Sequence, residues 1–207
     1  MKTTRIVIFA KAPLAGFAKT RLIPVLGQEG AATLAQNMLM DTLHEAIVAD
    51  IGVVELCVTP AIQDPAWQGV TLPTDVEISG QGEGDLGERL SRAAVRAISN
   101  TGSVLLIGTD CVEMSSTLLR SAVQALHEHD AVIHCTTDGG YALLGLDRFS
   151  PLLFSDIPWS TDKVASLTFD RIRQLGWSLH IGEVLRDVDE PQDLEFLPGK
   201  WGVHAVA

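Results

Sequence analysis

The sequence predicts an α/β protein in which a mostly parallel sheet lies between two layers of helices. Short apolar runs rich in β-branched residues alternate with longer segments of helical periodicity, an order typical of three-layer α/β folds. The length agrees, because 207 residues suit one such domain better than two. We therefore expect a single domain over residues 1–207, with ligands bound beyond the carboxyl ends of its strands.

The first half of the chain carries the clearest pattern. Its apolar runs are nearly continuous rather than alternating, which indicates strands buried on both faces. The helical segments show apolar residues at every third or fourth position, and a glycine follows where the first of them fades. In chain order we predict a strand over Arg5–Ala10, a helix over Gly30–Ile47, strands over Val53–Val58 and Asp75–Ser79, and a helix over Leu86–Ile98.

The second half continues the alternation and then loosens. Ser115 or Ser116 is the expected N-cap of the next helix, because a serine hydroxyl accepts a hydrogen bond from the open N–H groups of a first turn. The looser pattern favours an elaboration of the same sheet, and the tail after Pro198 should be peripheral. We predict a strand over Ser103–Ile107, a helix ending at Leu126, strands over Ala131–Cys135 and Tyr141–Leu146, a helix over Asp162–Leu175 and a strand over Ser178–Ile181.

Composition and charge exclude several classes of protein. With 46% hydrophobic and 20% charged residues, the chain is not disordered, collagen-like or a disulfide-stapled miniprotein. Its 26 acidic against 15 basic residues give a net charge of −11, which argues against nucleic acid or anionic membranes as partners. No apolar stretch reaches the roughly 18 residues of a membrane span and no signal-peptide cleavage pattern is visible, so we expect a cytoplasmic protein without membrane insertion.

The loop after the first strand concentrates positive charge in this acidic chain. It contains Lys11, Lys19 and Arg21, together with Gly16, which lets the backbone approach a ligand closely. These residues predict a binding site for the phosphates of a nucleotide. The loop is not a P-loop, because the G-x-x-x-x-G-K-[ST] spacing is missing. A solvated basic turn is the alternative, since exposed Lys and Arg need no function.

A glycine-rich loop over Gly82–Gly87 formally matches the dinucleotide fingerprint G-x-G-x-x-G. The match is weak, because the loop follows the third predicted strand rather than the first and its acidic residues would repel a pyrophosphate. One interpretation is that Gln81, Gly82, Asp85 and Gly87 contact a nucleotide, with Gln81 close to a base edge. A glycine-assisted helix start is the alternative interpretation.

Carboxylates follow two further strand-like segments. Asp110 stands directly after a predicted strand, a position that suits Mg²⁺, because magnesium prefers oxygen ligands and substrate phosphates. Asp187 and Asp189 share one face of an extended segment, where they repel each other unless a cation lies between them. Helix capping is the alternative for Asp110, and also for Asp189 or Glu190 before the helix that Pro191 opens.

The turn Asp138–Tyr141 is a further candidate. Its Gly139-Gly140 pair gives the backbone conformational freedom, and Asp138 adds an acidic group. Such a turn can admit a substrate closely or join two strands of a hairpin, and both interpretations stay open.

Four of these segments, in this order, resemble a bacterial family. The chain is similar to the radical-SAM/selenodomain-associated glycosyltransferase family 1, within the nucleotide-diphospho-sugar transferase superfamily, and the likeness spans residues 4–197. The first loop also resembles that of phospholactate guanylyltransferases, where a Lys-Ser-Arg-Leu run takes the place of Lys19–Leu22. The segments that carry the likeness are Ile8-Phe9-Ala10-Lys11-Ala12-Pro13-x-x-Gly16-x-x-Lys19-Thr20-Arg21-Leu22, Gly108-Thr109-Asp110-Cys111, Asp138-Gly139-Gly140-Tyr141 and Asp187-Val188-Asp189-x-Pro191-x-Asp193-Leu194.

The resemblance implies a GT-A-like, Rossmann-type fold that binds a nucleotide sugar or a nucleoside triphosphate with Mg²⁺ or Mn²⁺. It implies catalytic roles for Lys19 and Asp110, and phosphate contacts from the basic loop. The other implied residues are Asp187 and Asp189 as further metal ligands, Gln81 to Gly87 near the base, and Asp138, Gly139, Gly140 and Tyr141 near the acceptor or sugar.

Two departures from the family pattern fall on the acceptor side. Val112 stands where the family has Pro, and His134-Cys135-Thr136 stands where Gly-Pro-Ala is usual. The leading hypothesis is a metal-dependent glycosyltransferase that moves a sugar from a nucleotide to a small-molecule acceptor. The alternatives are a guanylyltransferase-like nucleotidyltransferase acting on a small phosphorylated acceptor, and a nucleotide-binding module without turnover.

Overall fold

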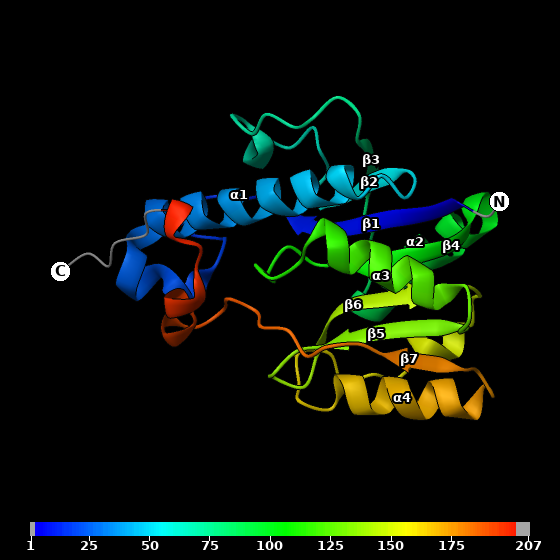
Figure 1. The fold of residues 1–207 in the computed structure, drawn as a ribbon. Coiled ribbons are helices and arrows are strands. Elements are labelled where there is room, and N and C mark those ends of the chain that lie inside the picture. Colours follow the sequence, from blue (N-terminus) through cyan, green and yellow to red (C-terminus); the bar gives the residue numbers. More distant parts are fainter. Residues whose placement is uncertain (1–2, 202–207) are drawn as a thin grey trace.

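A single seven-stranded sheet organises the protein (Figure 1). A computed structural model describes residues 3–201, and the strand order is β3-β2-β1-β4-β6-β5-β7. Of the described strands, only β6 runs antiparallel to its neighbours, β4 and β5, so the predicted mostly parallel sheet is confirmed. The strands are β1 Thr3–Lys11, β2 Val54–Thr59, β3 Glu77–Gly80, β4 Gly102–Ile107, β5 Ala131–Cys135, β6 Tyr141–Leu146 and β7 Leu179–Ile181.

Helices cover both faces of the sheet, as Figure 1 shows. Because successive strand residues point to opposite faces, Ile6 and Ile8 pack under α1 and α3, whereas Val7 packs under α2 and α4. None of the helices within residues 3–201 is long and apolar enough to cross a membrane. The helices are α1 Ile23–Ala49, α2 Leu86–Thr101, α3 Ser116–Leu126 and α4 Val164–Gln174.

Helix α1 begins earlier than the sequence predicts. It starts at Ile23 with Pro24 in its first turn, which is typical of helix N-termini, whereas periodicity predicts a start at Gly30. Gly27 interrupts the helix with φ +71° and ψ 170°. Because this kink shifts the phase of the apolar residues, the helical period is regular only beyond it.

Tertiary contacts also move two other predicted boundaries. Helix α4 starts at Val164 rather than Asp162, because the Asp162 backbone packs on the turn after β5: a Cβ added at Gly139 would lie 2.3 Å from the Asp162 carbonyl oxygen. Strand β3 starts at Glu77 rather than Asp75, since the pairing with β2 begins there. The N-cap prediction for α3 is confirmed, and Ser115 accepts the hydrogen bond.

A buried ion network joins the first three strands to α2. The Glu55 side chain on β2, 3% exposed, accepts hydrogen bonds from Arg5 at 3.0 Å, from Ser79 at 2.6 Å and from Arg96. Burial by itself would raise the pKa of Glu55, but the hydrogen bonds from Ser79 and Arg96 and the charges of the two arginines lower it. The fold therefore holds this carboxylate ionised.

We expect Glu55→Gln to lower the free energy of unfolding by about 3 kcal/mol at neutral pH, because it removes the buried carboxylate that Arg5 and Arg96 share and leaves the buried Arg5 paired with the mostly exposed Glu77. The wild-type pKa is depressed, so the carboxylate's contribution is present above the unfolded pKa of about 4.3 and is lost as pH falls through the folded pKa. Urea unfolding should therefore show a narrower gap between the two proteins in acid. Glu77→Gln is the control, with a loss below about 1 kcal/mol, because its carboxylate is 61% exposed. A gap that stays constant with pH would contradict the assignment.

Candidate functional site

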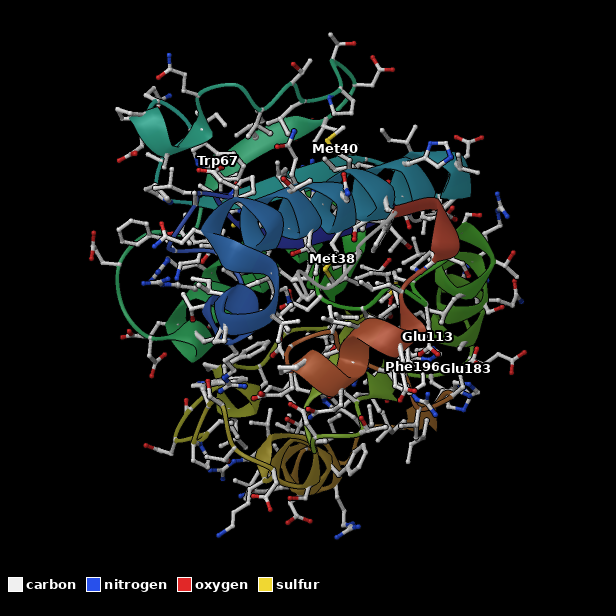
Figure 2. The ribbon with its side chains drawn as sticks, turned by 90° about the vertical axis from the view of Figure 1, so that its left-hand side faces the viewer. Met38, Met40, Trp67, Glu113, Glu183 and Phe196 are labelled. Atoms are coloured by element: carbon white, nitrogen blue, oxygen red, sulfur yellow. The ribbon has the colours of Figure 1, made fainter. Side chains whose placement is uncertain are left out.

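A pocket of about 620 Å³ opens at the carboxyl ends of β1, β2 and β4. Figure 2 views the molecule from this end, with Met38 of α1, one of the lining residues, labelled near the centre. This is the edge at which open α/β sheets bind ligands. The charged residues that line the pocket are Lys11, Lys19, Arg21, Arg89, Asp110 and Asp189.

Lys19 occupies the centre of the site's electrostatics. Its Nζ donates to Oδ1 of Asp110 and, at 2.8 Å, to Oδ1 of Asp189, and its side chain is 9% exposed. Burial opposes the charged form, but the two carboxylates outweigh it, so the pKa of Lys19 is raised and the ammonium stays protonated. The residue has φ +45°, a left-handed conformation that is uncommon for a non-glycine and is over-represented at functional sites.

The acidic segment that meets Lys19 is anchored by its middle residue. Val188 is fully buried, and its N–H donates to the Asp110 carbonyl at 2.9 Å. Asp187 pairs with Cys111 through an isolated bridge, so the segment runs beside the end of β4. With Val188 buried in the core, Asp187 and Asp189 lie on the other side of the segment, the shared face that their spacing predicts.

Asp187 is the most perturbed carboxyl group of this cluster. Burial, together with the charges of Asp110, Asp138 and Asp189, raises its pKa to about 7, and Lys19 offsets part of the rise. Within residues 3–201, no three His, Cys, Asp or Glu side chains already stand in an arrangement that would hold a metal ion. In the described structure, the cation between Asp110 and Asp189 is the Lys19 ammonium.

The glycine-rich loop proves to be a helix start. Asp85 accepts a hydrogen bond from the Glu88 N–H at 2.8 Å, and Glu88 accepts one from the Asp85 N–H at 2.9 Å, which together form a capping box for α2. Gly87 is required by packing, because a Cβ there would lie 2.4 Å from the Phe154 carbonyl oxygen. Gly82, Asp85 and Gly87 are not among the residues that line the pocket, although their neighbours Gln81 and Leu86 are, and their contact with a nucleotide stays a prediction.

Gln81 does line the pocket, and its orientation is fixed. Its Nε2 donates to the Ala10 and Cys57 carbonyl oxygens at 3.2 and 3.1 Å, so its Oε1 faces Arg89 at 3.4 Å. The Arg89 Nε also donates to the Gly84 carbonyl at 2.9 Å. Sequence reasoning missed Arg89. The available signal was a cation one turn into a helix that follows a strand-end loop.

The turn Asp138–Tyr141 closes the β5–β6 hairpin. The Thr136 N–H donates to the Gly140 carbonyl at 3.0 Å, and Asp138 accepts from the Thr136 hydroxyl and the Gly140 N–H. Tyr141 packs its ring into the core beneath α2 and α4, and burial of its hydroxyl raises its pKa. The turn thus places Asp138 near Asp187 and directs Tyr141 away from the pocket lining.

The remaining predicted residues belong to the basic loop. Gly16 has φ +80° and shapes the turn, and Lys11 lines the pocket. Arg21, with a side chain 65% exposed, pairs with Glu190 at 3.2 Å. The pocket therefore brings together cations that the sequence places in one loop and carboxylates that it places far away.

Comparison with known protein families identifies the family of this chain. Residues 42–161 match the family described as "Uncharacterized protein conserved in bacteria (DUF2064)". The chain belongs to this family. No curated protein matches the sequence.

Solved structures share the fold. A protein from Desulfovibrio desulfuricans G20, described as a "putative nucleotide-diphospho-sugar transferase", is 29% identical, with 92% of this chain and 84% of that one covered and a TM-score of 0.84. A 4-diphosphocytidyl-2C-methyl-D-erythritol synthase from Anaerococcus prevotii DSM 20548 is 14% identical, with 97% and 99% covered and a TM-score of 0.61. A CMP:2-keto-3-deoxy-manno-octonic acid synthetase complexed with CTP is 14% identical, with 94% and 96% covered and a TM-score of 0.59. The latter two show the fold alone.

We expect Asp187→Asn to change how stability depends on pH. The folded pKa of Asp187, about 7, lies above the unfolded value of about 3.9, so between these pH values the folded state holds a proton that the unfolded state has lost. This proton binding stabilises the folded state, and the stabilisation is lost as pH rises through 7. In metal-free buffer, the variant should therefore exceed the wild type in free energy of unfolding by on the order of 1 kcal/mol at about pH 8, with no excess near pH 4. Urea unfolding across this range tests it. Asp75→Asn, at an exposed position, is the control. If the difference in free energy of unfolding from the wild type is equally independent of pH for both variants, the assignment is contradicted.

Proposed function

We propose that this chain is a nucleotide-diphospho-sugar transferase that moves a sugar from a nucleotide to a small-molecule acceptor. The observation that carries the proposal is the pocket's charge: Lys11, Lys19, Arg21 and Arg89 line one cavity in a chain of net charge −11. Such a local excess of cations suits a polyphosphate. The similarity to the Desulfovibrio protein, at 29% identity over most of both chains, supports the same class of substrate.

The arginines and the lysines of the pocket would bind phosphate in different ways. Arg21 and Arg89 offer forked guanidinium groups that bind phosphate oxygens in pairs, and Lys11 and Lys19 add point charges. In glycosyl transfer, an acceptor hydroxyl attacks the anomeric carbon and gives up its proton to water or another base, the bond from that carbon to the diphosphate oxygen breaks, and the diphosphate leaves with the electron pair. The cations would neutralise that leaving group, so catalysis would consist of positioning and electrostatic stabilisation.

We also propose that Asp110, Asp187 and Asp189 hold a divalent cation, Mg²⁺ or Mn²⁺. The donor set fits, because it consists of carboxylate oxygens, and the charges of Asp110 and Asp189 disfavour ionisation of Asp187, a repulsion that a cation would relieve. When bound, such an ion would supply further positive charge to the phosphates.

Nucleotidyl transfer, including guanylyl transfer, is the second candidate. In this version, a phosphate of the acceptor attacks the α-phosphorus of a nucleoside triphosphate and pyrophosphate leaves. Four cations line the pocket together with Asp110 and Asp189, a net charge of +2 (four minus two), so a triphosphate would need the divalent cation as well. The fold likeness to the CMP:2-keto-3-deoxy-manno-octonic acid synthetase supports the same reading.

A thermal-shift panel of nucleotide sugars and nucleoside triphosphates, each with and without Mg²⁺, tests the proposal, because a ligand of the folded state raises the melting temperature. We expect a Mg²⁺-dependent rise that is greater for a nucleotide sugar than for its triphosphate. The reverse order would support nucleotidyl transfer. Binding without product from any acceptor would support a nucleotide-binding module, and no Mg²⁺-dependent rise would contradict the metal site.

Two variants separate the phosphate role from the metal role. Lys19→Ala should weaken binding of a nucleoside triphosphate about tenfold or more, because it removes a charge-assisted contact, yet leave binding of the corresponding nucleoside unchanged. Asp110→Asn should abolish the Mg²⁺ dependence of nucleotide affinity while the circular dichroism of the fold is retained. Isothermal titration measures both. Equal losses for nucleoside and triphosphate in Lys19→Ala would show that the loop acts only structurally.

A further inference from the structure

Phe17 stands out in the basic loop because it is a large apolar side chain turned to solvent at the pocket. Its side chain is 67% exposed, and it lines the same cavity as Lys11, Lys19 and Arg21. Leu86, the first residue of α2, lines that cavity too and is 41% exposed. The pocket therefore combines cations that would bind phosphates with apolar side chains that are exposed to solvent in the described structure.

The exposure of Phe17 does not come from a loose loop. The residues on either side of the segment, Ala12 and Ala18, are 3% and 6% exposed and belong to the packed interior. The Leu14 carbonyl accepts hydrogen bonds from the N–H groups of Phe17 at 3.0 Å and of Ala18 at 2.9 Å. The backbone thus presents the Phe17 ring outward from an anchored turn, so a ligand can contact it without ordering the loop first.

The charges of the pocket limit what can lie against this ring. The phosphates belong with the cations, and the Lys19 ammonium two residues away is tied to Asp110 and Asp189. What remains for Phe17 is an uncharged part of the same ligand. A planar ring fits best, because an aromatic face gains from stacking beyond the area that is buried.

We infer that Phe17 is a specificity-determining residue that stacks on the nucleobase of the bound nucleotide. The inference rests on the proposed function, because it assumes that a nucleotide occupies the pocket. It separates two parts of the ligand: the cations hold the phosphates, and Phe17 makes the protein prefer a nucleotide to a bare polyphosphate.

The test compares Phe17→Ala with Leu14→Ala. Leu14 lies in the same loop and is 39% exposed, but it is not among the residues that line the pocket, which makes it a matched control. Isothermal titration with Mg²⁺ would measure two probes, a nucleoside triphosphate and inorganic tripolyphosphate. Loss of one base–aromatic stack weakens binding by about 5- to 150-fold. With Phe17→Ala, we expect that loss of affinity for the nucleoside triphosphate and less than about a twofold change in affinity for tripolyphosphate. With Leu14→Ala, we expect less than about a twofold change in affinity for either probe.

Phe17→Trp provides the rescue, and we expect it to bind the triphosphate at least as tightly as the wild type, because it keeps an aromatic face. Equal losses of both probes in Phe17→Ala would overturn the inference and give the residue a loop-shaping role. Unchanged triphosphate affinity would also overturn it, including when an aromatic acceptor loses affinity instead. If the wild type binds tripolyphosphate but no nucleotide, the inference fails while the phosphate site stands. If the wild type binds neither, the proposed function itself fails.

Discussion

The site depends on one interaction, the Lys19 ammonium held between the carboxylates of Asp110 and Asp189. These groups are 91 and 170 residues away from Lys19 in the chain, and they come from the end of β4 and from the C-terminal segment. A charge that is 9% exposed is stable only when opposite charges and hydrogen bonds replace its water. The position of the basic loop and the position of the acidic segment are therefore energetically linked.

In the acidic segment, residues 187–193, some residues fix the backbone and others present their carboxylates to the site. Val188 inserts into the interior, while Asp193 accepts hydrogen bonds from the backbone N–H groups of Asp189 at 2.9 Å and of Glu190 at 2.7 Å. Asp193 thus acts on the backbone and sets the position from which Asp189 reaches Lys19. The Asp-Val-Asp-x-Pro-x-Asp pattern is consequently one unit, in which two residues hold the chain so that the others can present their carboxylates.

The sequence predicts the fold better than the site. Apolar runs place every strand to within about two residues, because burial on both faces leaves a strong local signal. The kink at Gly27 and the pairing that begins β3 at Glu77 depend on contacts elsewhere, which local periodicity does not contain. In the site, Asp110 is predicted by its strand-end position, Lys19 by the cations of its loop and Asp189 by the face it shares with Asp187, but their mutual contact depends on tertiary geometry. Arg89 is not predicted as a site residue, because a helical arginine has the same local sequence pattern whether it faces water or a pocket.

The central ion pair also has a consequence for the proposed metal. Lys19 donates to Oδ1 of both carboxylates, which leaves Oδ2 of each for a metal, and the repulsion between the two nearby cations would then weaken the Lys19 ion pair. A released Lys19 remains charged and lies in a pocket lined by further cations, where an anion is its best new partner. Metal binding at the carboxylates and phosphate binding by Lys19 would then favour each other, because each removes an obstacle to the other. The same ammonium that stabilises the acidic cluster in the described structure is thus suited to couple the two halves of the ligand site.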